Sequence, residues 1–173
     1  MCCMVISAGA EEYPSTSPLT VYSGGAAIGV IRAFNYPLKF ESKTFFKLSF
    51  INDIYLKDVT HLFIDADWLA PRANLAMDIG LDYLLSNSSF RPFIGAGIGV
   101  RYFDKKGYKF GENFGPSATA HIGALIELSK TVQVRIRLPF HVALNETNDR
   151  GAGLDIGLLF SKPYKNVKKL NYD

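Results

Sequence analysis

The segment from residue 118 to residue 160 largely alternates apolar and polar side chains with a period of two. In residues 132–144 all seven even-numbered positions are apolar, whereas Arg135 and Arg137 lie on the opposite face. This period predicts β-strands with one apolar face, and at ~3.3 Å per residue that face is about 40 Å long. Charges in the middle of the other face are unusual for a thin soluble sheet. The pattern therefore favours a barrel with lipid outside and polar groups inside.

The same alternation can be followed along most of the chain. It predicts eight strands, each long enough to cross a bilayer, over residues Leu19–Phe34, Lys43–Leu56, Thr60–Leu69, Ala73–Leu85, Phe90–Phe103, Phe114–Ser129, Val132–Leu144 and Gly151–Ser161. Tight turns such as 87–89 alternate with longer connections such as 104–113, an asymmetry typical of outer-membrane barrels. We therefore predict an all-β fold, an eight-stranded antiparallel up-and-down transmembrane β-barrel.

The composition agrees with a single membrane-embedded domain. The 173 residues are 48% hydrophobic, with 13 Phe and 9 Tyr, and the net charge is only +3. No run approaches the ~18 apolar residues of a transmembrane helix, so a spanning chain would have to cross with strands. The basic residues are not concentrated on one surface, which argues against nucleic-acid binding.

The two ends of the chain are predicted to lie outside the barrel. Residues 1–10 resemble the end of an export signal, because an apolar start precedes the A-x-A pattern of Ala8-Gly9-Ala10. Residues 11–18 form a short N-terminal segment, residues 19–161 the barrel, and residues 162–173 a short basic tail. Both cysteines lie in residues 1–10, so a mature chain starting at Glu11 has none for a disulfide, thiol catalysis or a zinc site.

Charged side chains recur on the face opposite the apolar one. An eight-stranded barrel has an interior only just wide enough for side chains, and inward glycines such as Gly95, Gly97 and Gly99 make room for long neighbours. Because buried charges need partners, five basic and seven acidic inward residues predict a salt-bridged plug. This predicted lumen charge network consists of Lys47, Asp53, Asp65, Asp67, Asp78, Asp82, Arg91, Arg101, Glu127, Arg135, Arg137 and Asp155.

Some inward residues also invite a metal-site hypothesis. His121 and His141 face inward on adjacent strands and would meet diagonally, and four aspartates could hold a cation at one end of the barrel. The simpler expectation is that the histidines are ordinary interior residues and that Asp65, Asp67, Asp78 and Asp82 pair with Arg91 and Arg101. We therefore expect neither a metal site nor a cofactor.

Two polar residues, Arg32 and Asn52, fall on the predicted lipid face. Each is expected to lie near a membrane interface or at a bulge. Aromatic residues lie towards several strand ends, where barrels of this type carry an aromatic girdle; these are Trp68, Tyr102, Phe114 and Phe140.

Two stretches resemble a known family. Residues 91–100, RPFIGAGIGV, resemble the R-P-aromatic-x-G-x-G-x-G strand of the small bacterial outer-membrane β-barrel superfamily, which includes the transmembrane domain of outer-membrane protein A. Residues 152–160 are similar to the closing strand of such proteins, although this chain continues for a further 13 residues. The resemblance implies a Gram-negative outer membrane and a closing strand that the barrel-assembly machinery recognises, here through Leu154, Ile156, Gly157, Leu158 and Phe160.

Three classes of function follow from these observations. The leading expectation is an outer-membrane protein with a closed polar lumen that is not a general porin. It would have a structural, anchoring or loop-mediated role, no catalytic residue, contacts with outer-membrane lipid, and an extracellular or periplasmic partner that the sequence does not identify. An outer-membrane lipid-modifying enzyme is the first alternative, because residues 141–153 resemble the closing strands of lipid A deacylases. The nucleophile of those enzymes would be a Ser two residues after the His, and this chain has Ala143 there.

A soluble lipocalin-like carrier of small ligands is the other alternative. Such a carrier needs an apolar lumen and a polar exterior. Asp78, Asp82, Arg135 and Arg137 lie on the wrong face for that arrangement.

Overall fold

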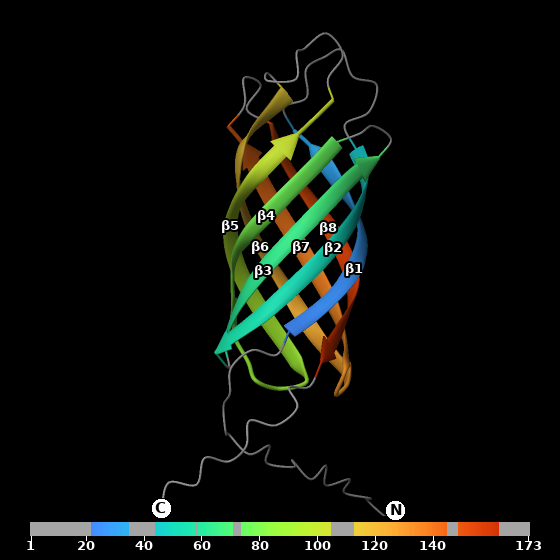
Figure 1. The fold of residues 1–173 in the computed structure, drawn as a ribbon, viewed down its shortest axis with the longest axis vertical. Coiled ribbons are helices and arrows are strands. Elements are labelled where there is room, and N and C mark those ends of the chain that lie inside the picture. Colours follow the sequence, from blue (N-terminus) through green and yellow to red (C-terminus); the bar gives the residue numbers. More distant parts are fainter. Residues whose placement is uncertain are drawn as a thin grey trace, which may run out of the picture.

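A computed structural model describes residues 22–34, 44–57, 59–70, 74–104, 113–144 and 149–162 of the chain. The eight strands are β1 (Tyr22–Ala33), β2 (Thr44–Lys57), β3 (Thr60–Ala70), β4 (Asn74–Leu84), β5 (Phe90–Tyr102), β6 (Phe114–Ser129), β7 (Val132–Ala143) and β8 (Arg150–Lys162). They form a closed antiparallel barrel, which confirms the predicted fold (Figure 1). The predicted leader remnant and nearly all of the predicted tail, together with most of the longer loops, lie outside the described residues.

The first and last strands pair with each other and close the barrel. β1 pairs with β2 on one side and with β8 on the other, so that Ile28 lies opposite both Leu48 and Ile156. Because every strand has two neighbours, no sheet edge is left with unpaired backbone groups. Among the described residues, no helix is long and apolar enough to span a membrane.

The two faces of the sheet have opposite chemistry. Outward side chains are apolar and exposed, for example Ile98 at 69% and Phe50 at 62% of their full surface, whereas the inward Arg135 and Lys47 are 0% and 1% exposed. This arrangement reverses that of a soluble barrel, which excludes the lipocalin-like alternative. It satisfies the requirement of a bilayer, where the outer surface has to be apolar.

The ladder has three local irregularities. Register shifts occur between Tyr55 and Lys57 and between Glu127 and Ser129, next to the short turns. The β7–β8 pairing runs from Val132 to Arg137 and resumes at Phe140. Pro139 lies in this interruption, and its lack of an N–H group removes a ladder hydrogen bond.

The two polar residues on the lipid face have different surroundings. Arg32 is exposed near the end of β1, whereas Asn52 is in the interior of β2, three residues before the bulge. Asn52 therefore lies near a bulge, as expected. In addition, Tyr22 crosses Gly24 and donates its hydroxyl hydrogen to Asn52 Oδ1, which shields the amide from lipid.

Two apolar clusters lie inside the barrel. One is near the long-loop end and consists of Ile31, Ala33, Phe45, Leu69 and Phe103. The other is nearer the short-turn end and consists of Ala27, Ile51, Leu84, Phe93, Leu125 and Leu159. Along β2, Lys47 lies between Phe45 of the first cluster and Ile51 of the second, so most of the lumen charges are enclosed by apolar side chains.

Because alternate side chains of β7 face lipid, a charge introduced there should destabilise the barrel by an amount that depends on its depth in the bilayer. Ile136→Arg should destabilise the barrel by about 2–4 kcal/mol, because it places a charge near the bilayer midplane, whereas Val142→Arg on the same face near the interface should cost about 0–1 kcal/mol. Urea unfolding in phospholipid vesicles measures both costs. Equal costs would contradict the depths assigned to these two residues.

Candidate functional site

The lumen contains two linked groups of ion pairs. Lys47 Nζ lies 3.0 Å from Asp67 Oδ2 and 2.9 Å from Asp155 Oδ2. Asp155 also accepts from Arg137, at 3.2 Å from Nη2, and Arg137 Nη1 forms a further short ion pair with Asp65. A carboxylate shared between two cations ties strands β2, β3, β7 and β8 together across the lumen.

Arg135 is the centre of the second group. Its guanidinium lies 3.1 Å from Asp53, 3.4 Å from Asp82 and 3.6 Å from Asp65. The same group lies over the rings of Phe63 and Phe93, at 5.9 and 5.7 Å from their centres. The guanidinium of Arg135 therefore contacts carboxylates, and it also lies over two aromatic rings. This geometry suits a planar buried cation.

The two arginines predicted to pair with the four aspartates have different kinds of partner. Arg101 pairs with Asp78 at 2.7 Å. Arg91 instead pairs with Glu127 at 2.5 Å, near the short turns and partly exposed, so the predicted pairing of Arg91 with aspartates is wrong. The other aspartates take Lys47, Arg135 and Arg137 as partners.

Inward glycines leave space for large side chains in the lumen. A Cβ added at Gly95 would lie 2.0 Å from Asp82 Oδ1 and 2.3 Å from His121 Nε2, which themselves are 2.6 Å apart. A Cβ at Gly97 would lie 2.8 Å from the ring of Phe63. The R-P-x-x-G-x-G-x-G strand thus supplies the free volume that this part of the network occupies.

The two inward histidines lie in separate environments. His121 contacts Asp82 and packs against Phe63 and Phe93. His141, near the long-loop end, stacks on Phe103, and neither of its ring nitrogens has a hydrogen-bond partner among the described residues. The described part of the chain contains no group of three or more His, Cys, Asp or Glu residues suited to a metal ion.

The position two residues after His141 is buried inside the barrel. Ala143 is 0% exposed and lies opposite Ser117 of β6. Ser117 is directed to Asp78, at 3.4 Å from Oδ1, and not to His141. No serine–histidine pair is therefore assembled around His141 among the described residues.

The closing strand presents the residues of the predicted assembly signal to both faces. Leu154, Ile156, Leu158 and Phe160 point outward and are 41–58% exposed. Gly157 points inward, where an added Cβ would lie 2.8 Å from that of Ala27.

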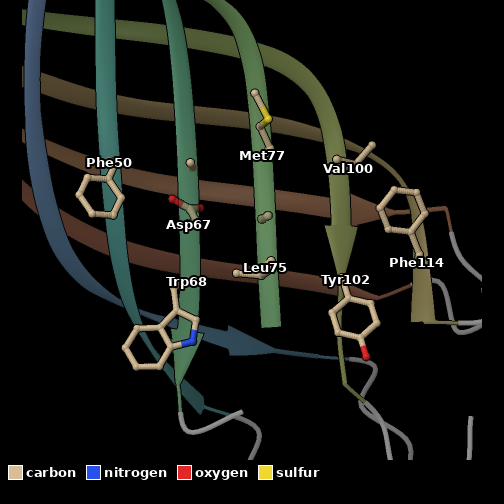
Figure 2. Close-up of a pocket in the computed structure, with 10 residues that line it drawn as sticks. Phe50, Asp67, Trp68, Leu75, Met77, Val100, Tyr102 and Phe114 are labelled. Carbon is tan, nitrogen blue, oxygen red and sulfur yellow. The ribbon is translucent and has the colours of Figure 1, made fainter. Parts of the chain in front are cut away.

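A groove on the outer wall was not anticipated from the sequence. It has a volume of about 580 Å³ and lies over β2 to β6, near the long-loop end (Figure 2). Its lining is almost entirely apolar and consists of Phe50, Ala66, Trp68, Leu75, Ala76, Met77, Val100, Tyr102 and Phe114, together with one charged residue, Asp67. The one indication of the groove in the sequence is Ala66, a small residue at an outward position between larger outward residues.

The fold defines a class of proteins. The barrel is similar to Neisserial surface protein A, with a TM-score of 0.64, 14% identity, and coverage of 82% of this chain and 97% of that one. It is also similar to the N-terminal β-barrel domain of Pseudomonas aeruginosa OprF, with a TM-score of 0.59, 15% identity, and coverage of 82% and 100%. These likenesses support the fold alone, that of the small eight-stranded outer-membrane barrels.

The family is narrower than the fold. The family model for lipid A 3-O-deacylase (PagL) matches residues 28–142, more than half of the chain. The chain belongs to this family, and its location is the bacterial outer membrane. No functionally curated protein matches the chain in sequence.

Membership in this family corrects the expectation that the chain is not an enzyme. The family is defined by a hydrolytic reaction on lipid A, and the matched segment includes His141. The absence of a serine at residue 143 led to that expectation. The similarity to the family, by contrast, extends over all of β2 to β6 and parts of β1 and β7.

The ion pairs of the lumen predict unequal roles for two arginines. Arg135→Ala should destabilise the barrel by about 3–5 kcal/mol, because it leaves buried carboxylates without their cation. Arg91→Ala removes a partly exposed ion pair and should cost at most about 1 kcal/mol. Urea unfolding in vesicles compares the two; a cost for Arg135→Ala as small as that for Arg91→Ala would contradict the role assigned to the buried network.

Proposed function

We propose that the protein acts on lipid A in the outer leaflet, by hydrolysing an ester that links an acyl chain to it. The match of residues 28–142 to the lipid A 3-O-deacylase family carries this proposal. The barrel resides in the membrane that holds this lipid, and its outer wall has an apolar groove at the end where long loops emerge. Long loops of such barrels are extracellular, so the groove lies at the depth of the outer leaflet.

His141 is the candidate general base. It lies within the matched segment, and its ring nitrogens are not engaged by other described residues. It is 1% exposed and faces the lumen. Ala143 cannot form an acyl-enzyme ester, so the attacking oxygen comes from a water molecule or from another hydroxyl. Ser117 lies opposite Ala143, but its hydroxyl is directed to Asp78 and would have to turn towards His141 to act as the nucleophile.

The proposal predicts a change in lipid A. Expression of the protein in a Gram-negative host should produce lipid A that lacks one ester-linked acyl chain, as measured by mass spectrometry. His141→Ala should abolish the loss of the chain, because removal of a general base typically costs 10²–10⁴-fold in rate. Unmodified lipid A, despite folded wild-type protein in the outer membrane, would refute the proposal.

Two further variants identify the source of the attacking oxygen. Ser117→Ala eliminates the activity if that hydroxyl is the nucleophile and leaves it unchanged if water attacks. Ala143→Ser restores the hydroxyl that the family resemblance places two residues after the histidine, and it should raise the activity if His141 can activate it. Migration on gels with and without heating verifies that each variant is folded.

A structural role of the closed barrel is the second candidate function. The enclosed ion-pair network and the two apolar clusters favour it, because they fill the lumen with mutually paired groups. Such a barrel anchors its loops at the cell surface without serving as a general porin.

A filled lumen predicts that the purified monomer gives no large, stable single-channel conductance in planar bilayers. Eight strands leave little free lumen, and apolar clusters lie near both ends of it. Sustained large conductance steps from the wild-type protein would contradict the closed barrel and direct its function towards transport.

A further inference from the structure

The outer wall of the barrel carries two charged side chains next to each other. Among the strand residues whose side chains the structure describes, the charged residues that point outward are Arg32 of β1 and Arg150 of β8, and both are exposed. Most of the other outward positions are apolar, for example Ile28 and Leu154. A charge on the lipid-facing side of a barrel is costly, so the placement of these two arginines needs a physical reason.

The register of the β1–β8 seam makes the two arginines neighbours. Arg32 lies opposite Ala152, and the next outward residue of β8 towards the long-loop end is Arg150. The backbone N–H of Phe34 donates to the carbonyl oxygen of Arg150 at 2.8 Å, so the two strands stay paired past both arginines. Diagonal neighbours of this kind are ~7–8 Å apart, within reach of long side chains. The two guanidinium groups can therefore contact the same ligand.

The surroundings of the two arginines contain no compensating charge. Each buried cation of the lumen has a carboxylate partner, whereas neither Arg32 nor Arg150 has an ion pair among the described residues. The strand residues opposite them are the uncharged Thr44, Ala152 and Val142. Adjacent like charges destabilise a sheet, and an anion bound between them would remove that repulsion.

The depth and the size of the neighbours indicate the kind of anion. Arg32 is the second-to-last residue of β1 and Arg150 the first of β8, so both lie at the long-loop end. Because long loops of such barrels are extracellular, this end is at the level of the outer-leaflet headgroups. Ala152 has only a methyl group, so no bulky side chain stands between the two guanidinium groups. Arginine binds phosphate through two parallel hydrogen bonds, and a phosphate is therefore the anion that suits this pair.

We propose that Arg32 and Arg150 together bind a phosphate group of lipid A on the outer side of the β1–β8 seam. The choice of lipid A rests on the proposed function. The choice of a phosphate rests on the adjacent arginines, their depth and the uncharged residues around them. Because the pair is on the lipid-facing wall, the phosphate belongs to a lipid headgroup and not to a soluble molecule.

This site lies on the outer side of the wall segment against which the candidate base packs. Gly151 stands between Arg150 and Ala152 in β8 and points inward. A Cβ added there would lie 2.6 Å from Cε1 of His141. The arginine pair therefore holds the lipid headgroup on the part of the wall that has His141 behind it.

Native mass spectrometry of the purified barrel in detergent measures the bound lipid directly. The protein is incubated with lipid A or with chemically dephosphorylated lipid A, with EDTA present to remove divalent cations that bridge phosphates. We expect wild type to bind lipid A about tenfold or more tightly than the dephosphorylated lipid, because the latter offers no charged acceptor to the guanidinium groups. Inorganic phosphate in excess should not displace lipid A, because it lacks the acyl chains that keep the lipid at the wall.

Relocation of one charge provides the matched control. Arg32→Gln combined with Ala70→Arg keeps two outward arginines at the long-loop end but separates them, since Ala70 is the last residue of β3. This variant, like Arg150→Gln, should bind lipid A as weakly as wild type binds the dephosphorylated lipid. Lys130→Gln removes a charge from a short turn at the other end and should bind as wild type. Migration on gels with and without heating verifies that each variant is folded.

Equal binding of lipid A by wild type and by the relocated variant would overturn the proposal, because two separate interfacial arginines would then be sufficient. Displacement of lipid A by an equal concentration of phosphatidylglycerol would overturn the assignment to lipid A, since any anionic headgroup would then bind. The mass of the bound lipid also reports hydrolysis. Selective binding of lipid A that keeps all its acyl chains supports the phosphate site and refutes the hydrolase. Loss of an acyl chain with equal binding by all variants does the reverse.

Discussion

The structure depends on one constraint, the closure of the backbone hydrogen-bond ladder in a medium without water. Each unpaired N–H or C=O group in lipid costs several kcal/mol, so β1 has to meet β8 as well as β2. Closure with eight strands makes the lumen narrow. The alternation of side chains then sends every second residue into that narrow space, which is why the interior needs both glycines and mutually neutralising charges.

The lumen contains more buried carboxylates than buried cations. Four cationic residues, Lys47, Arg101, Arg135 and Arg137, are buried in the described structure together with six aspartates of the charge network. The excess of carboxylates is compensated because single cations contact several of them. Lys47 contacts Asp67 and Asp155, and Arg135 contacts three aspartates, Asp53, Asp65 and Asp82. Removal of one member of such a network is costly, because it leaves a buried charge without its partner.

The family and the local chemistry point in different directions at residue 143. The family match indicates an enzyme that removes an acyl chain from lipid A, whereas Ala143 has no hydroxyl and His141 lies in the lumen. A fold of this class provides the membrane location, and the side chains on its wall and at its long-loop end decide the chemistry.

The sequence by itself determined the number of strands, their bounds to within a few residues, and which face meets lipid, because a period of two leaves no other assignment for Ile136 and Arg137. It did not determine which charges pair: Arg91 takes Glu127, and Lys47 bridges Asp67 and Asp155. Nor did it reveal the groove at Ala66. Contacts across a lumen or between adjacent strands depend on how far each strand is displaced along its neighbour when the barrel closes. That displacement is a property of the whole ring of strands, so only the tertiary structure could decide it.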